Sequence, residues 1–140
     1  MKVRDIMTDK VEIVSPDTSL ENVARLMAEN NIGSVPVCQE KTILGLITDR
    51  DIVIRTVAKG ENPVTMKARD VMSTDIISVS PDTDAHEAAD KMSEYQIKRL
   101  PVVENGKLTG IIALGDLAIE NIHIDEAGNA LSGISQGIQH

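Results

Sequence analysis

The sequence predicts an α/β (α+β) fold of two β-α-β-β-α repeats, packed with pseudo-two-fold symmetry. The first observation is an internal match, because residues 3–53 align without a gap with residues 68–118 and about a third of the aligned positions are identical. The second observation is that β-rich runs alternate with stretches of helical spacing in both copies. A repeat that cannot bury its apolar face alone has to pack against its neighbour, so we expect the copies to pack as a pair.

The strands are predicted from β-rich runs bounded by turn residues. Each repeat begins with a short run, VEIV at residues 11–14 and IISV at residues 76–79. Two further strands follow in the first repeat, SVPVC and TILGLIT, joined by the polar turn QEK. The equivalent turn of the second repeat contains Asn105-Gly106, which is a strong signal for a hairpin.

The helices are predicted from capping residues and apolar spacing. Both first strands lead into SPDT, a turn and helix start; Thr18 and Asp84 fit capping boxes, each with a Glu three residues later. A second helix is expected near Asp49 and near Leu114, and a right-handed crossover would place both helices on one face of the sheet. The apolar positions of the first helix are Leu20, Val23, Ala24 and Met27, matched by Ala85, Ala88, Ala89 and Met92.

We therefore divide the chain into four parts. Residues 1–60 form the first repeat, residues 61–67 a linker, residues 68–124 the second repeat, and residues 125–140 a C-terminal tail. The tail is rich in Gly, Ser, Asn and Gln, and its stretch AGNALSGI is a candidate helix.

The composition excludes several classes of protein. A formal net charge of −8 and a single aromatic residue, Tyr95, argue against a nucleic-acid polymer as partner. The charged N-terminus lacks the apolar core of a signal peptide, and no apolar run is long enough to span a membrane. With one cysteine, Cys38, we expect a soluble protein of a reducing compartment, the cytoplasm.

One phrase is written twice, GLITDRD at residues 45–51 and GIIALGD at residues 110–116. In the first copy, Thr48 stands where a strand meets a helix, and its hydroxyl can cap that helix or contact a phosphate. Asp51 is an acceptor that suits a ribose diol. The alternative is that both residues only cap their own helix. Arg50 is a candidate phosphate or subunit contact, with a plain surface role equally open.

Taken together, the paired motifs resemble a tandem pair of cystathionine-β-synthase (CBS) domains, a Bateman module. The resemblance covers about residues 3–122 and rests on DIMT and DVMS, the two SPDT segments, IGSVPV and IKRLPVV, and the two Gly-x-x-(Thr)-x-x-Asp phrases. It implies a stand-alone regulatory module that is not an enzyme, needs no cofactor, and senses energy status through AMP, ADP, ATP or S-adenosylmethionine. It also implies a homodimer of pairs that acts on an unknown protein target.

In the family pattern each cleft takes its Thr and Asp from one repeat and its base-contacting strand from the other. Arg99 would then present a guanidinium fork to phosphate, and Leu46 and Ile77 would flank the base; a surface charge or an ion pair is the alternative for Arg99. The carried-over site A comprises Leu46, Thr48, Asp51, Ile76, Ile77, Ile97, Lys98 and Arg99.

A weaker site B is expected from the same pattern, because Ala113 lacks the hydroxyl of Thr48 and Gly33-Ser34 replaces Lys98-Arg99. It would accept an uncharged adenosine-like molecule or remain empty. Site B comprises Val11, Ile32, Gly33, Ser34, Ala113 and Asp116.

Two other functional classes are weighed against nucleotide sensing. An enzyme would need a catalytic set, but the histidines are scattered, no metal-ligand spacing occurs, and Cys38 fits a buried, inert thiol. A protein-interaction module without a small-molecule ligand remains the main alternative. A metal site at His123 or His140 has no motif behind it.

Overall fold

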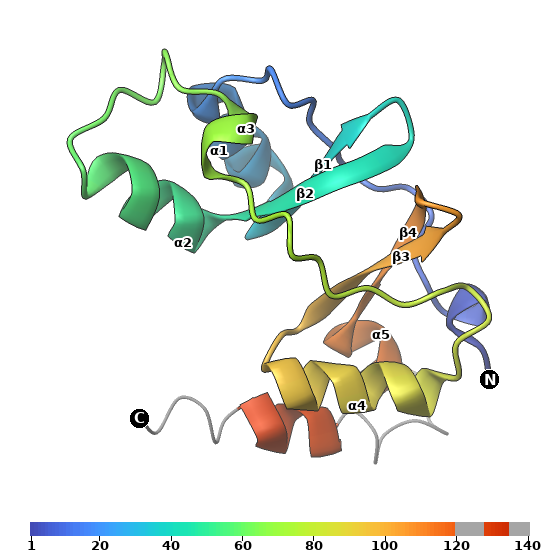
Figure 1. Ribbon diagram of the computed structural model, residues 1–140. Coiled ribbons are helices and arrows are strands. Elements are labelled where there is room, and N and C mark those ends of the chain that lie inside the picture. The colour runs from blue at the N-terminus through green and yellow to red at the C-terminus, as the bar shows by residue number, and fades with distance from the viewer. Residues whose placement is uncertain (120–127, 135–140) are drawn as a thin grey trace. The chain divides into compact units, whose positions relative to one another are not determined.

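The computed structural model describes residues 1–119 and 128–134 and divides into two compact units (Figure 1). Unit 1 comprises residues 1–11 together with the chain from residue 77 onward, and unit 2 comprises residues 12–76. The start of the first repeat thus belongs with the second repeat, and the start of the second repeat belongs with the first. The repeat boundaries predicted at residues 60 and 68 stay predictions. The compact units are a different division of the chain, with boundaries after residues 11 and 76.

The predicted α+β repeats are confirmed, and both units follow the same order of a helix, a hairpin and a second helix. Unit 2 contains α1 (Leu20–Asn30), β1 (Ser34–Gln39), β2 (Thr42–Thr48), α2 (Asp49–Ile52), which continues as a π-helix (Val53–Val57), and α3 (Ala68–Val71). Unit 1 contains a short 3-10 helix (Val3–Asp5), α4 (Ala85–Tyr95), β3 (Arg99–Glu104), β4 (Lys107–Ala113), α5 (Leu114–Ile119) and a helix at residues 128–134.

The first predicted strand of each repeat shrinks to a single parallel bridge, so this prediction of a strand was wrong. Val14 bridges Val37 in unit 2, and Val79 bridges Val102 in unit 1. The ladder does not extend over the rest of each predicted strand, because its preceding hydrogen bond would need a backbone N–H at Pro36 or Pro101, which proline lacks.

The first helix of unit 2 is capped by Ser19 rather than by the predicted Thr18. The Ser19 side chain accepts a hydrogen bond from the Asn22 amide at 3.2 Å, whereas the Thr18 hydroxyl accepts from the Ser15 amide at 3.1 Å and so closes the SPDT turn. Asp84 is the N-cap of α4 as predicted and accepts from the His86 amide at 2.8 Å. The Thr18 hydroxyl does not cap the helix because it is hydrogen-bonded within the turn that precedes the helix.

Each unit has its own apolar core, to which the predicted helix positions contribute as expected except for Ala24, which is exposed. The core of unit 2 holds Val14, Leu20, Val23, Met27, Val35, Val37, Ile47, Ile52, Ala68 and Val71. The core of unit 1 holds Val3, Val79, Ala85, Ala88, Ala89, Met92, Leu100, Val102, Ile112, Leu117 and Ala130.

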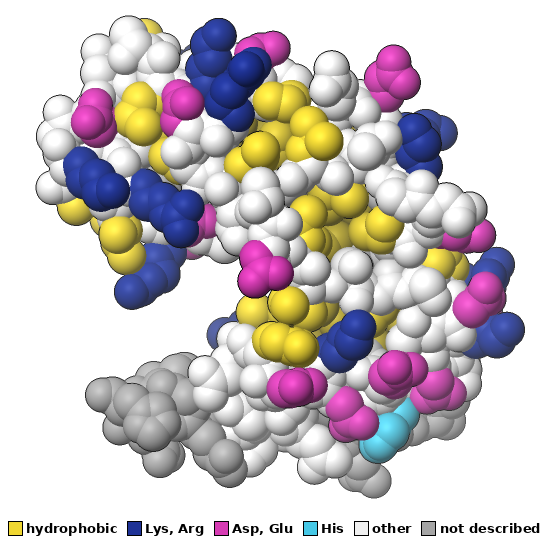
Figure 2. Space-filling model, viewed as in Figure 1, with side chains coloured by type: hydrophobic (Ala, Val, Ile, Leu, Met, Phe, Trp, Pro, Cys, Tyr) yellow, Lys and Arg dark blue, Asp and Glu magenta, His cyan; other side chains and the backbone are white. Residues whose placement is uncertain are grey.

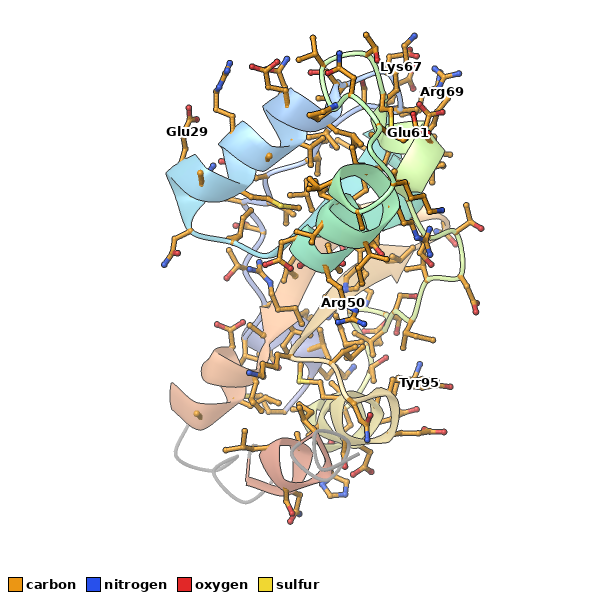
Figure 3. The ribbon with its side chains drawn as sticks, turned by 90° about the vertical axis from the view of Figure 1, so that its left-hand side faces the viewer. Glu29, Arg50, Glu61, Lys67, Arg69 and Tyr95 are labelled. Carbon is orange, nitrogen blue, oxygen red and sulfur yellow. The ribbon has the colours of Figure 1, made fainter. Side chains whose placement is uncertain are left out.

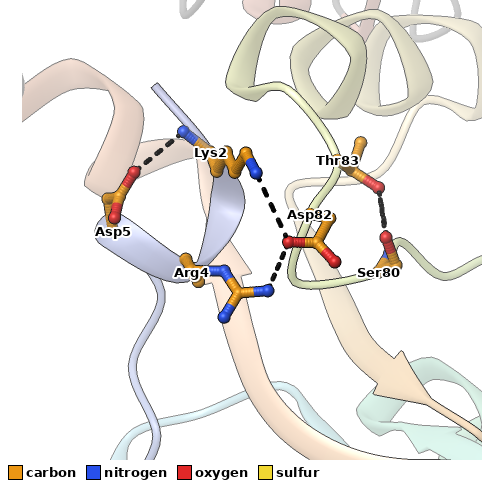
Figure 4. A network of polar contacts seen from close by, with 6 residues as sticks. All are labelled: Lys2, Arg4, Asp5, Ser80, Asp82 and Thr83. Carbon is orange, nitrogen blue, oxygen red and sulfur yellow. Dashed lines mark hydrogen bonds and ion pairs between the residues drawn. The ribbon is translucent and has the colours of Figure 1, made fainter.

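Ion pairs join the N-terminal segment, residues 1–11, to the rest of unit 1. Lys2 and Arg4 both contact the Asp82 carboxylate of the second SPDT turn, the lysine at 3.6 Å (Figure 4). The hydrogen bond and the charge of Arg4 hold the pKa of the Asp82 carboxyl below its ordinary value. In the same segment, the Lys2 amide donates to the Asp5 carboxylate at 3.0 Å, which fixes the short helix.

Unit 2 repeats this arrangement with the equivalent residues. Lys67 and Arg69, at the edge of the molecule in Figure 3, both contact the Asp17 carboxylate of the first SPDT turn. The Lys67 amide donates to Asp70 at 2.8 Å. The K-x-R-D motif is therefore a clasp for an SPDT turn in both units.

The glycines of the repeated phrase allow a close approach of the backbone in each hairpin. Gly45 on β2 lies beside Ser73, and a Cβ added there would be 2.9 Å from the Ser73 carbonyl oxygen. Gly110 on β4 lies beside Thr8, where the same atom would be 2.8 Å from the Thr8 carbonyl oxygen. The backbones form bridges here, with Leu46 and Ser73 exchanging two hydrogen bonds of 2.9 Å.

The hairpin turns differ in how well their residues suit them. Asn105 and Gly106 both have positive φ, at 53° and 77°, which confirms the predicted turn. Unit 2 places Glu40 at φ 58° in the equivalent turn, where a residue without a short polar side chain is strained.

Candidate functional site

The end of β2 and the start of α2 form a closed local motif in unit 2. The Thr48 amide donates to Asp51 Oδ2 at 2.9 Å, and the Asp51 amide donates to Thr48 Oγ1 at 3.1 Å. The two residues therefore cap their own helix, which was the alternative to ligand binding. The cap leaves the Thr48 hydroxyl proton and Asp51 Oδ1 available, because a hydroxyl and a carboxylate each have more bonding capacity than the cap uses.

Few described groups compete for that remaining capacity. Arg55 Nε lies 3.9 Å from Asp51 Oδ1, at the outer limit of an ion pair, and its guanidinium also donates to the Val71 carbonyl at 3.0 Å. The Asp51 side chain is 20% exposed, so it can still be reached. Arg50 is exposed on the same helix (Figure 3).

The equivalent motif in unit 1 is half formed. The Ala113 amide donates to Asp116 Oδ2 at 2.8 Å, but alanine has no hydroxyl to accept a bond in return. The loss of the hydroxyl therefore removes both a cap acceptor and a potential ligand donor from this copy.

Within each unit, the structure brings together residues that the sequence assigned to different sites. In unit 2, Ser34 of predicted site B is the cross-strand partner of Thr48 of predicted site A. In unit 1, Arg99 of site A is the partner of Ala113 of site B, and the Leu114 amide donates to the Lys98 carbonyl at 2.8 Å. The division into sites A and B stays a prediction.

The remaining predicted residues are divided between the units. Ile97 and Ile77 are half-buried against the core of unit 1, and Ile32 is half-buried against the core of unit 2. Gly33 lies close to Asp49, whose amide donates to the Gly33 carbonyl at 2.9 Å. Leu46, Val11 and Ile76 are also partly buried.

Unit 1 contains a cavity of about 560 Å³ beside Arg99. Arg99 Nε is buried and has no hydrogen-bond partner among the described residues. Sequence reasoning found Lys98, Arg99 and Ala113 but missed the rest of the wall, because no motif marks it. The lining residues are Lys98, Arg99, Ala113, Leu114, Gly115, Ala118, Gly128 and Leu131.

The described residues offer no clear alternative chemistry. Cys38 is buried as predicted, and burial raises the pKa of its thiol, which lowers its reactivity. Within the described residues, 1–119 and 128–134, no group of three or more His, Cys, Asp or Glu side chains could hold a metal ion. His123 and His140 lie outside the described residues. No helix among the described residues is long and apolar enough to cross a membrane.

The family model for the CBS domain matches the chain twice, at residues 3–56 and 68–121. The chain belongs to the CBS domain family. The predicted tandem CBS pair is thereby confirmed, and the two matches include both repeated phrases and both SPDT turns.

Known CBS proteins resemble this chain over most of its length. The CBS domain-containing protein YhcV of Bacillus subtilis is 41% identical over 133 residues, covering 95% of this chain and 94% of YhcV. A crystal structure of Hypoxic Response Protein I, described with two coordinated zinc ions, has a TM-score of 0.79 at 34% identity and covers 86% of this chain and 98% of its own. A CBS domain protein of unknown function from Thermoplasma acidophilum, TA0289, has a TM-score of 0.80 at 27% identity. The match covers 95% of this chain and 75% of the TA0289 chain.

Proposed function

We propose that this CBS pair is a regulatory module, without catalytic activity of its own, that binds an adenine nucleotide or adenosyl ligand. The observation that carries the proposal is Arg99, whose buried Nε lacks a partner among the described residues at the edge of a cavity. A buried, unsatisfied cationic donor is costly unless an acceptor such as a phosphate reaches it.

The turn at Thr48 and Asp51 in unit 2 offers polar groups of its own to such a ligand. Asp51 Oδ1, which the cap does not use, can accept hydrogen bonds from a ribose diol, and the Thr48 hydroxyl can donate to phosphate. With Tyr95 as the only aromatic residue of the sequence, the base would be held by aliphatic side chains such as Leu46 rather than by aromatic stacking.

The half-formed motif of unit 1 is expected to contribute less. A hydrogen bond to a charged group is worth about 1.5–3 kcal/mol, so the missing hydroxyl at Ala113 corresponds to roughly a 10- to 150-fold loss in affinity. Asp116 should therefore matter less than Asp51 for a phosphorylated ligand.

The proposal is tested by calorimetric titration of AMP, ADP, ATP and S-adenosylmethionine into protein that has been freed of bound ligand. The variants are Asp51→Asn, Arg99→Ala and, as matched control, Asp116→Asn. At position 51, asparagine keeps an oxygen that can accept the cap hydrogen bond from the Thr48 amide. It removes the negative charge that would attract the ribose hydroxyls and that pairs with Arg55. We expect the first two variants to lose at least tenfold in affinity and the control to stay close to the wild type. If none of the four compounds binds the wild type, the interaction-module alternative takes its place.

Regulation requires that ligand binding favour one conformational state over another. We propose that the protein acts as a homodimer whose altered surface is read by a protein target. Apolar side chains are exposed at the surface among charged ones (Figure 2). On the π-helix of unit 2, Val53 is 55% exposed, Ile54 42% and Val57 64%. Such a patch suits a second copy of the chain. Sedimentation of Val57→Asp with and without AMP tests this part: a dimer that is unchanged by the aspartate removes this surface as the interface.

A further inference from the structure

We propose that the helix at residues 128–134 completes a pocket in unit 1 for a small anion with an apolar body, and that ligand binding and docking of this helix are coupled. The inference rests on the proposed function only for its first probe, AMP. The pocket is the cavity of about 560 Å³ beside Arg99, a size suited to a small ligand.

One face of this helix is seated on unit 1 through small and apolar residues. Ala130 is fully buried in the core of unit 1, and Ile134 is 5% exposed. At Gly133, an added Cβ would lie 2.9 Å from the Cβ of Ser93 and 3.1 Å from its Cα, so the helix backbone rests directly on α4. Figure 1 shows the two helices side by side. The predicted helix AGNALSGI is thus confirmed over residues 128–134.

The same helix supplies a wall of the cavity. Leu131 is 50% exposed although its neighbour Ala130 is fully buried, and with Gly128 it lines the cavity. Leu114 and Ala118 of α5 provide further apolar lining. A leucine that is half exposed in a concave wall can be covered by the apolar body of a ligand, which is favourable in proportion to the area removed from water.

Among the described residues that line the cavity, the charged ones are both cations, Lys98 and Arg99. This is notable in a chain with a formal net charge of −8. Because Arg99 Nε is buried without a partner among the described residues, an anionic oxygen at this place would satisfy it. Phosphate monoesters, carboxylates and sulfonates share that chemistry.

Coupling follows from the length of the helix. A helix of about two turns is unstable in isolation, so its helical state depends on docking. A ligand that touches Leu131 binds the docked state more tightly than the undocked state and must stabilise it by the same free energy.

The test uses two probes on the full chain. AMP is titrated by calorimetry, and 8-anilinonaphthalene-1-sulfonate, an anion with an apolar body, by fluorescence. The variants are Leu131→Asn and Arg99→Ala, with Asn129→Ala as the matched control because Asn129 is exposed on the same helix and does not line the cavity. We expect about a tenfold weaker binding for the first two and no change for the control. Hydrogen exchange at residues 128–134 should slow several-fold when the probe binds, and thermal melts establish that each variant is folded.

The outcomes separate this inference from the proposed function. If AMP binds the wild type and Leu131→Asn equally well, the helix is not part of the pocket, while nucleotide binding stands. If AMP does not bind but the sulfonate binds in a way that depends on both Leu131 and Arg99, the pocket stands with a different anion and the nucleotide proposal falls. If neither variant weakens either probe, or if exchange at residues 128–134 does not slow, the inference is overturned.

Discussion

Replacement of Gly45 by alanine should destabilise the protein, because the new Cβ has no room. It would lie 2.7 Å from the Met72 sulfur and 2.9 Å from the Ser73 carbonyl oxygen, well inside van der Waals contact. The methionine can move, but the carbonyl is backbone and belongs to the bridge that joins Leu46 to Ser73 through two hydrogen bonds. Overpacking costs about 1–3 kcal/mol, and each weakened hydrogen bond adds up to about 1.5 kcal/mol.

We therefore expect Gly45→Ala to lower the free energy of unfolding by about 2–3 kcal/mol, or the melting temperature by about 6–10 °C for a chain of this size. Thermal unfolding followed by circular dichroism measures this. The matched control is Gly115→Ala, since a Cβ there meets nothing within 4 Å and an alanine favours the helix. Gly110→Ala should behave like Gly45→Ala, because its Cβ would press on the Thr8 carbonyl oxygen. If Gly45→Ala melts at or above the wild-type temperature, the close approach is not a constraint and the reasoning fails.

Three further predictions concern single side chains. Thr56→Val should raise the free energy of unfolding by about 1 kcal/mol in chemical denaturation, because the buried Thr56 hydroxyl has no partner among the described residues; a loss would show that the hydroxyl is satisfied. Glu40→Asn should add about 0.5–1 kcal/mol by relieving the positive φ, and an unchanged midpoint would mean that no strain is stored there. Because the pKa of Asp82 is lowered in the fold by Arg4, its ion pairs stabilise the native state above the unfolded pKa. That contribution is lost as the pH falls through the folded pKa. Asp82→Asn should flatten the dependence of stability on pH in that acidic range, as seen in melts at a series of pH values.

Local signals in the sequence predicted the elements well, because they act over a few residues. The turn at Asn105-Gly106 follows from the backbone freedom of its two residues, and the helix faces follow from apolar spacing. The Thr48–Asp51 motif was also readable, since the same spacing that suits a ligand suits a capping box. For that reason the spacing alone could not separate the two roles.

The failures have equally local causes. The predicted strands are reduced to bridges at Val14 and Val79, because Pro36 and Pro101 in the neighbouring strands cannot donate to the ladder. Thr18 does not cap the helix because its hydroxyl already accepts a hydrogen bond from the Ser15 amide. Ala24 satisfies the apolar spacing but is exposed, since an alanine can lie at the edge of a helix face at little cost.

What the sequence could not show are contacts between distant segments. The K-x-R-D clasps join residues whose pairing no periodicity encodes, and the seat of residues 128–134 on α4 depends on the absence of a side chain at Gly133. The buried Nε of Arg99 is likewise a product of tertiary packing. Five of the eight residues that line the cavity therefore had to come from the structure.

The clasps also set an order of assembly during synthesis. Unit 2 is one continuous stretch, residues 12–76, and can fold as soon as it has left the ribosome. Unit 1 is discontinuous, because residues 1–11 need the SPDT turn at Asp82 and the strand that carries Gly110. Residues 1–11 can therefore take up their native positions only after the chain from residue 77 onward has been made, while unit 2 is already folded. Residues 1–11 are thus made before unit 2 and yet reach their native positions after it.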